Sequence, residues 1–374
     1  MYKAILPVKI NIPFIVLTMA SIFLYNTIES RRPNTLKTRL PYSVFFGIKE
    51  YLVSDKYNLN EIPKTVYSPI DSLKIVFVLG ETVRADHLQI NGYSRETTPL
   101  LSKRNKIVSF PNVFTPYTYT GASLPRIMTN ASVEDENLKE ITSVFDVFNA
   151  CKYETIWFGN QELEISFESI TRTNKQIVLI DSLRSYMSFK KVLDEELLVP
   201  FKNSFLENEA NALYSLHMLG SHWWYENRYS PSHRKFKPVI DSKYIPSLSK
   251  EEIINSYDNT IYYLDNFLNQ VIEIQDRKNY PSILIYLSDH GEVLGEEGKW
   301  LHAQESEFSK NPAAIVWYSD EFQKRFPNKI KALKNNKNKR FTTDLLYHSL
   351  LDLLEVKNIY YNKSKSVFFQ IMDE

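Results

Sequence analysis

Six short runs of apolar, β-prone residues follow one another from residue 73 onward, and longer stretches separate them. The runs are LKIVFVL (73–79), KIVSF (106–110), ETIWF (154–158), ALYSLHML (212–219), SILIYLS (282–288) and AAIVWY (313–318). Several are apolar on both faces, which is typical of buried parallel strands. Helical patterns lie between or after them, near 120–130, 142–150, 187–207, 250–275 and 341–355. This alternation predicts an α/β fold.

Size and charge narrow the classes of function. The 374 residues are 43% hydrophobic and 24% charged, which is ordinary for a globular protein. The formal net charge of +1 does not favour nucleic acid as a partner, because nucleic-acid binding relies on a basic surface. Cys151 is the only cysteine, so the chain contains no internal disulfide.

The N-terminus carries a run of sixteen residues, INIPFIVLTMASIFLY (10–25), that is apolar apart from Asn11, Thr18 and Ser21. It is shorter than the about twenty residues that a full membrane span usually needs. No small-residue cleavage site follows it, so we expect an uncleaved N-terminal membrane anchor over residues 1–30. Flanking lysines and arginines lie on both sides and do not fix its orientation.

Residues 31–72 are punctuated by prolines and are expected to form a juxtamembrane linker. Within them, YSVFFGIKEYL (42–52) has apolar positions that suit a short helix at the membrane interface. A surface helix packed on the soluble domain fits the same pattern equally well. Residues 73–374 form the predicted catalytic domain.

Three of the apolar runs end in unusual polar residues. Glu81 follows the first, His222 lies just beyond the fourth, and Asp289 and His290 follow the fifth. In open α/β sheets, functional groups gather where strands end. A carboxylate and an imidazole in this position suit a borderline cation such as Zn²⁺.

The seven histidines divide into two groups. His217, His222, His290 and His302 lie within or just beyond the predicted strand ends. For the other three we expect surface or packing positions without a chemical role; these are His87, His233 and His348.

A hydroxyl-rich segment, TPYTYTGASLPRIMTN (115–130), supplies candidate nucleophiles at what reads as a helix start. Free backbone N–H groups at a helix start favour phosphate. Thr118, Thr120 and Ser123 each fit either an N-cap or an attacking hydroxyl, and the residues alone do not separate them.

Longer segments resemble the catalytic domain of bacterial phosphoethanolamine transferases, which belong to the alkaline phosphatase and sulfatase superfamily. The resemblance covers nearly all of residues 72–356, and the string GETVRADHLQINGYSRETTP is its most specific part. It implies a sulfatase-like or alkaline-phosphatase-like domain, with a mostly parallel central sheet flanked by helices. The segments that carry it are 80–101, 109–128, 216–231, 255–268, 287–303 and 313–322.

The resemblance also implies a chemistry. Zn²⁺ would be held by Glu81, Thr120, Asp289 and His290, and Thr120 would be the nucleophile that forms a phosphothreonine. His222 and His302 correspond to histidines that line the phosphoryl pocket, and His217 to a further pocket histidine.

The implied partners are a phosphatidylethanolamine donor, an acceptor that is lipid A or another envelope glycan, and the membrane. The implied location is the bacterial inner membrane, with the catalytic domain facing the periplasm. The oligomeric state is not indicated.

The chain also departs from the family pattern. Pro116 and Arg126 stand where relatives carry a cysteine pair around the nucleophile, so we expect packing to hold that loop. The segment 159–162 replaces the family's Asp-Asn segment, and Ile165 falls near the position of a substrate-binding lysine. Head-group recognition is therefore expected to differ most.

Three other functions compete with this interpretation. A sulfatase-like hydrolase would share fold and metal, but its signature places Arg two residues after Pro, whereas here Arg126 follows Pro125 directly. A phosphoglycerol transferase would differ only in the donor head group, and the GETVRAD string favours phosphoethanolamine. A non-catalytic domain that binds metal or lipid would not need both the ligands and the pocket histidines.

Overall fold

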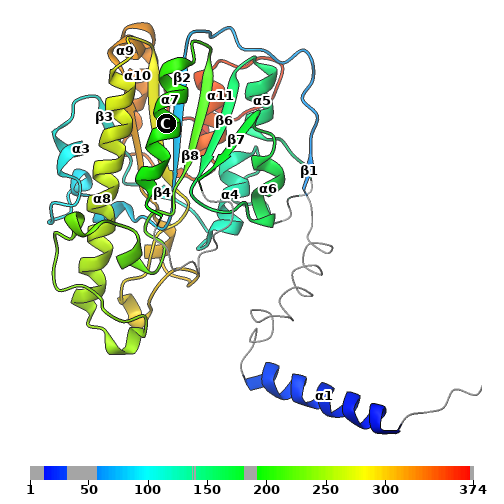
Figure 1. Cartoon of the computed structure of the whole chain (residues 1–374). Helices are drawn as coiled ribbons and strands as arrows, with labels where there is room; N and C mark the ends of the chain where they lie inside the picture. Colours follow the sequence, from blue (N-terminus) through cyan, green and yellow to red (C-terminus); the bar gives the residue numbers. More distant parts are fainter. Residues whose placement is uncertain (1–11, 32–56, 137, 139, 181–191, 371–374) are drawn as a thin grey trace, which may run out of the picture. The chain divides into compact units, whose positions relative to one another are not determined.

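The computed structural model describes residues 12–31, 57–136, 138, 140–180 and 192–370, and the chain separates into two compact units, 1–55 and 56–374 (Figure 1). In the first unit, helix α1 (Ile12–Arg31) contains most of the apolar run at 10–25. No helix within these described ranges is long and apolar enough to cross a membrane. The anchor over residues 1–30 stays a prediction, and the predicted helix at 42–52 lies outside the described residues.

The second unit is built around a seven-stranded sheet with the order β3-β10-β9-β2-β8-β6-β7. Strands β9, β2, β8, β6 and β7 run parallel to one another, and β10 is antiparallel to both β9 and β3. The predicted mostly parallel sheet is therefore confirmed. The strands are β2 (Lys74–Gly80), β3 (Ile107–Ser109), β6 (Glu154–Gly159), β7 (Gln176–Leu179), β8 (Ala212–His217), β9 (Ser282–Ser288) and β10 (Ala314–Tyr318).

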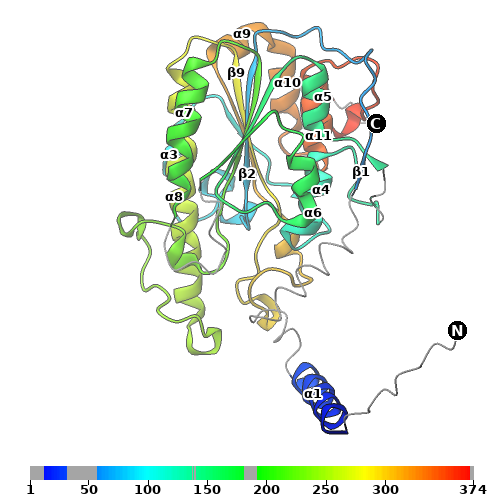
Figure 2. The same cartoon turned by 45° about the vertical axis from the view of Figure 1, so that its right-hand side comes forward.

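Both faces of the sheet are covered by helices, as the edge-on view in Figure 2 shows. Strand β2 divides its side chains by the two-residue period of a strand: Ile75 and Phe77 join one apolar core, and Val76 and Val78 join the other. Two-sided burial explains why these runs read as continuously apolar.

The helices of the second unit lie mainly between the strands in sequence. Helix α8 begins with a capping box, in which Ser249 and Glu252 each accept a hydrogen bond from the other's backbone N–H. The helices are α3 (Pro99–Lys103), α4 (Thr120–Met128), α5 (Val144–Ala150), α6 (Ile165–Thr171), α7 (Leu198–Glu207), α8 (Lys250–Asp276), α9 (Asp320–Arg325), α10 (Pro327–Asn336) and α11 (Leu345–Leu353).

Two short parallel pairs complete the unit. Strand β1 (Asn58–Leu59) pairs with β5 (Glu140–Ile141), and β4 (Val113–Phe114) pairs with β11 (Phe341–Thr342). The pairing of β4 with β11 joins the segment before α4 to the segment before α11.

Several element predictions were wrong in detail. The Asn/Lys-rich stretch near 328–340, interpreted as a solvated loop, is largely helix α10, because Ile330 and Leu333 are buried one turn apart behind a polar outer face. The helix expected at 187–207 begins only at Leu198, after a 3₁₀ turn at Asp194–Leu197; residues 187–191 lie outside the described residues. The edge strand β7 was not predicted.

Candidate active site

The polar residues at the strand ends converge because the strands that precede them are neighbours in the sheet. In the parallel pairing of β2 with β9, Gly80 lies opposite Ser288, so Glu81 and Asp289 leave the sheet side by side. On the other side of β2, Leu79 lies opposite His217 at the end of β8. The carboxyl ends of three strands therefore deliver their side chains to one edge of the sheet.

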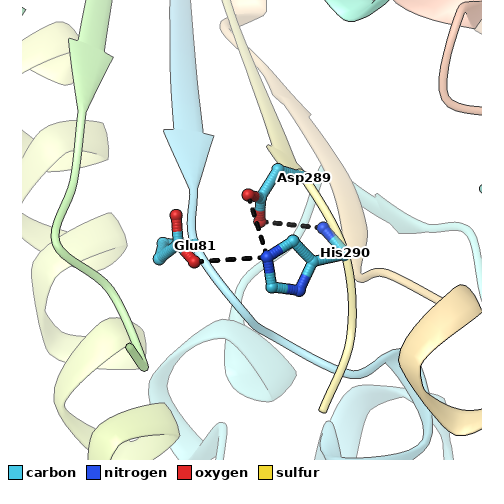
Figure 3. A group of neighbouring side chains, drawn as sticks. All are labelled: Glu81, Asp289 and His290. Atoms are coloured by element: carbon cyan, nitrogen blue, oxygen red, sulfur yellow. Dashed lines mark hydrogen bonds and ion pairs between the residues drawn. The ribbon is translucent and has the colours of Figure 1, made fainter. Parts of the chain in front are cut away.

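Glu81, Asp289 and His290 form a buried cluster that could hold a metal ion (Figure 3). One ligand atom from each residue lies within 4.8 Å of the others. His290 Nε2 is 3.4 Å from Glu81 Oε1 and 3.3 Å from Asp289 Oδ2. Two carboxylates and one imidazole form a donor set that Zn²⁺ accepts.

Hydrogen bonds around the cluster orient the imidazole and one acid. His290 Nδ1 lies 2.8 Å from the carbonyl oxygen of Gly291, which can only accept, so Nδ1 carries a proton and Nε2 is the nitrogen directed at the two acids. Asp289 Oδ1 accepts from the backbone N–H of His290 at 2.8 Å. Asp289 Oδ2 and His290 Nε2 are buried without a hydrogen-bond partner in the part of the chain that the structure describes.

The three groups perturb one another's pKa. Burial alone would raise the pKa of Glu81, but the ion pair with His290 holds it well below its ordinary value. Burial and the charge of Glu81 raise the pKa of Asp289 to about 7. Burial would lower the pKa of His290, yet the charge of Asp289 and the contact with Glu81 raise it to about 10. The cluster therefore favours a positive charge between its acids.

Thr120 is the candidate hydroxyl that meets this cluster. It is the first residue of α4, and its Oγ1 donates a hydrogen bond to Glu81 Oε2 at 2.9 Å. Ser123 is fully buried, and its hydroxyl has no hydrogen-bond partner within the described ranges. Thr118 contributes its backbone carbonyl, which accepts from Ala303 N at 2.8 Å. Geometry thus separates three hydroxyls that the sequence left equivalent.

Two predicted pocket histidines lie beside the cluster. The ring centroid of His302 is 4.8 Å from that of His222 and 5.4 Å from that of His290. Burial would lower the pKa of His302, but the nearby Glu292 carboxylate raises it. Burial is the main cause that lowers the pKa of His222. Two adjacent imidazoles with oppositely shifted pKa suit proton donation and acceptance.

His217 has a different environment from the other predicted site histidines. Its ring packs against Trp157, with centroids 5.3 Å apart, and against Phe167 at 5.7 Å. It is 1% exposed, and burial lowers its pKa to about 4. The imidazole is therefore neutral near pH 7 and has little surface for a ligand.

The three histidines expected to lack a chemical role lie away from the cluster residues. His87 is buried and contacts Asp258, with Nδ1 2.7 Å from Oδ1. His348 is buried and accepts from the backbone N–H of Asn362 at 3.2 Å. His233 is half-buried and lies within 2.7 Å of the Ser230 hydroxyl. Surface or packing positions were expected for all three; His87 and His348 are buried, and His233 is half-buried.

The segment around Thr120 is held by packing and hydrogen bonds. The guanidinium of Arg126 lies over the Tyr117 ring, 4.0 Å from its centroid, and donates to the Ala122 carbonyl at 2.9 Å. Tyr117 in turn donates its hydroxyl to the Val133 carbonyl at 3.0 Å. These contacts tie both sides of Thr120 to α4 and the following turn.

The altered segment after β6 lies near the site. Asn160 donates its side-chain amide to Asp194 Oδ1 at 2.9 Å, and its backbone N–H donates to the His217 carbonyl. Ile165 is the first residue of α6 and is 41% exposed. A lysine at this position would present a charge, whereas Ile165 presents an apolar surface.

Sequence reasoning missed Asp194, which organises the turn before His222. Its buried carboxylate accepts from Leu219 N at 2.7 Å and from Gly220 N at 2.9 Å. The next residue, Ser221, donates its backbone N–H to the Glu81 carbonyl at 2.9 Å. No motif marks Asp194, because it lies in an ordinary acidic helix start.

Glu292 was also missed as a residue of the site, although it stands only two residues after His290. It is fully buried, accepts from the Tyr225 hydroxyl at 2.8 Å and lies 3.9 Å from His302 Nδ1. At this distance the carboxylate acts on the His302 imidazole through its charge. Its position in the DHGE string was an available signal.

Comparisons with known proteins found a family model that lies within the second unit, and relatives of known name. The Sulfatase family model matches residues 74–356. Phosphoethanolamine transferase EptA of Escherichia coli (strain K12) is 30% identical over 309 residues, which are 78% of this chain and 55% of that protein. The Helicobacter pylori (strain ATCC 700392 / 26695) protein of the same name is 34% identical over 254 residues, which are 64% of this chain and 46% of that protein. The chain thus spans about half the length of the curated relatives it matches.

Two solved structures from Neisseria meningitidis share the fold. The soluble domain of lipooligosaccharide phosphoethanolamine transferase A superposes with a TM-score of 0.75 at 29% identity, covering 83% of this chain and 97% of that one. The integral membrane protein of that name has a TM-score of 0.74 at 26% identity, covering 95% of this chain and 68% of that one.

Proposed function

The chain belongs to the sulfatase family, and on this premise we propose that it transfers phosphoethanolamine from phosphatidylethanolamine to lipid A or another envelope glycan. The observation that carries the proposal is the hydrogen bond from Thr120 Oγ1 to Glu81 at the rim of a buried acid and imidazole cluster. The names of the relatives, all phosphoethanolamine transferases, support the head group.

The residues of the cluster fit a zinc ion. Asp289 Oδ2 and His290 Nε2 are buried 3.3 Å apart without hydrogen-bond partners among the described residues, which is costly unless a cation or proton lies between them. Glu81, Asp289 and His290 would hold Zn²⁺, with Thr120 as the fourth ligand. When bound, Zn²⁺ lowers the pKa of a neighbouring hydroxyl and neutralises charge on phosphate oxygens.

The proposed reaction consists of two displacements at phosphorus. In the first, Thr120 Oγ1 forms a bond to phosphorus while the bond from phosphorus to the diacylglycerol oxygen breaks. The Thr120 proton passes toward Glu81 Oε2, which already accepts it as a hydrogen bond. The leaving oxygen takes a proton from the imidazole pair of His222 and His302, whose rings adjoin the cluster.

In the second displacement, a hydroxyl of the acceptor attacks phosphorus and the bond to Thr120 Oγ1 breaks. The attacking hydroxyl gives its proton to the imidazole pair, and the Thr120 oxygen regains its proton from Glu81 Oε2. The net result moves phosphoethanolamine and leaves the protein unchanged.

The site of action is proposed to be the outer face of the bacterial inner membrane, with the catalytic unit in the periplasm. Both the donor lipid and the acceptor are membrane components, and one solved relative is an integral membrane protein. The apolar run at residues 10–25 is consistent with attachment to a bilayer.

The donor head group is tested with two labelled lipids. The full chain is incubated with Zn²⁺ and detergent-dispersed lipid that carries the label in either an ethanolamine or a glycerol head group. We expect label on the protein from phosphatidylethanolamine only. Label from phosphatidylglycerol instead would identify a phosphoglycerol transferase, and release of free head group without labelled protein would favour a hydrolase.

A further inference from the structure

Thr82, which follows Glu81 directly, has a backbone conformation that its side chain disfavours. Its φ is +62°, in the left-handed region. β-branched residues rarely adopt this region, because the branched Cβ crowds the backbone, whereas glycine adopts it freely. Thr82 is fully buried, so its surroundings must fix this conformation.

The conformation lets Thr82 bind both acids of the cluster at once. Its hydroxyl donates to Glu81 Oε1 at 2.6 Å, and its backbone N–H donates to Asp289 Oδ1 at 3.0 Å. Its carbonyl accepts from the hydroxyl of Tyr257 at 2.8 Å. The Tyr257 hydroxyl also accepts from the backbone N–H of Arg84 at 2.9 Å, which clamps the chain on both sides of the turn.

These bonds help to set the direction in which each carboxylate oxygen faces. With Oε1 of Glu81 held by the Thr82 hydroxyl, Oε2 faces the hydroxyl of Thr120. With Oδ1 of Asp289 occupied by two backbone N–H groups, Oδ2 faces the imidazole of His290. Without the Thr82 hydroxyl, the Glu81 carboxylate loses one of the contacts that fix its rotation.

We propose that Thr82 is a positioning residue of the zinc centre, which fixes the orientation of Glu81 through its hydroxyl and of Asp289 through its backbone N–H. This inference rests on the proposed zinc-dependent function. Glycine would suit φ of +62° better but has no hydroxyl, so the strained threonine is explained by the hydrogen bond to Glu81.

Three substitutions of Thr82 distinguish a role in positioning the metal ligands from a role in the stability of the fold alone. Thr82→Gly relieves the backbone strain and removes the hydroxyl, Thr82→Val keeps the shape and strain but removes the hydroxyl, and Thr82→Ser keeps the hydroxyl. Three quantities are measured for each full-chain variant. The thermal midpoint of unfolding is measured without metal, and the Zn²⁺ affinity is measured by competition with a chelator. Phosphoethanolamine transfer is measured at saturating Zn²⁺.

We expect Thr82→Gly to have a thermal midpoint at or above that of the wild type, while its Zn²⁺ affinity falls about 10- to 100-fold, as for other residues that orient metal ligands. Thr82→Ser should stay within about threefold of the wild type, and Thr82→Val should resemble the glycine variant in affinity. If the valine variant fails to fold, the comparison of the glycine and serine variants still tests the proposal.

Wild-type Zn²⁺ affinity in Thr82→Gly would overturn the inference. A fall in the thermal midpoint without a change in affinity would assign Thr82 a structural role only and would overturn it as well. The affinity measurement needs no donor lipid. If the wild type transferred nothing but the affinity pattern held, the proposed function would fail and the positioning role would stand.

Discussion

The hydroxyl of Thr120 donates a hydrogen bond to Glu81 Oε2 over 2.9 Å and so joins the start of α4 to the end of β2. The two residues are 39 positions apart in the chain. Glu81 is held in turn by His290 and Thr82, so the hydroxyl meets a carboxylate whose orientation is already fixed. A nucleophile in this position needs no separate general base.

Thr120→Ala should abolish transfer, because it removes the attacking oxygen while leaving the apolar contacts of α4 in place. Ser123→Ala is the matched control: its hydroxyl lies in the same helix but is buried without a partner in the described residues. We expect transfer to fall to background in the first variant and to stay within about twofold in the second. Comparable losses in both would show that the helix, and not the hydroxyl, matters.

Asp289→Ala should lower Zn²⁺ affinity by more than about 100-fold, because it removes a ligand and not merely a residue that orients one. Asp265→Asn serves as control, since that buried carboxylate accepts from Leu100 N and Leu101 N and does not belong to the cluster. Metal analysis after dialysis measures bound zinc. Equal zinc content in both variants would show that the ligand set is misassigned.

Gly220→Ala should weaken the zinc centre from outside the ligand set. Gly220 has a φ of +51°, and an added Cβ would lie 2.7 Å from the Glu81 carbonyl oxygen. Gly92→Ala is the control for backbone strain alone, because Gly92 has a φ of +100° but open space around it. Chelator competition should show lower Zn²⁺ affinity only for Gly220→Ala. If both variants kept wild-type affinity, the packing of this turn on Glu81 would not matter for the metal.

The buried His348 should contribute a pH dependence of stability unconnected with transfer. Burial lowers its pKa from 6.5 to about 4. A lowered histidine pKa gives stability that is complete above pH 6.5 and is lost as the pH falls toward 4, because the unfolded chain then binds the extra proton. The loss amounts to about 2 to 3 kcal/mol.

His348→Gln should therefore flatten the decline of the thermal midpoint between pH 7 and about 4.5, while transfer at pH 7 stays unchanged. Thermal unfolding of the wild type and the variant across that range measures the effect. A steep decline that persists in the variant would assign the pH dependence to other groups.

The fold and the site could be predicted from the sequence where a local pattern of residues reflects the geometry of the sheet. Continuously apolar runs marked the buried parallel strands, and the polar residues after them predicted which side chains would meet. Glu81 and Asp289 do meet, because β2 and β9 are adjacent and in register at Gly80 and Ser288. The order of the strands itself is not encoded in any short segment.

Other features depend on contacts that no local pattern reveals. The left-handed conformation of Thr82 and the buried carboxylate of Asp194 arise from partners distant in sequence. Helix α10 was missed because lysines and asparagines dominate its composition, although Ile330 and Leu333 bury one face. The short edge strand β7 presents too few residues for its alternation to stand out.

The most direct test of the account is to locate the covalent intermediate. Full-length protein is incubated with Zn²⁺ and phosphatidylethanolamine without an acceptor, then digested with trypsin, which releases residues 107–126 as one peptide. We predict that fragmentation mass spectrometry finds phosphoethanolamine on Thr120, and none on Thr118 or Ser123. An unmodified peptide from protein that transfers phosphoethanolamine to its acceptor, or modification at another residue, would contradict the account.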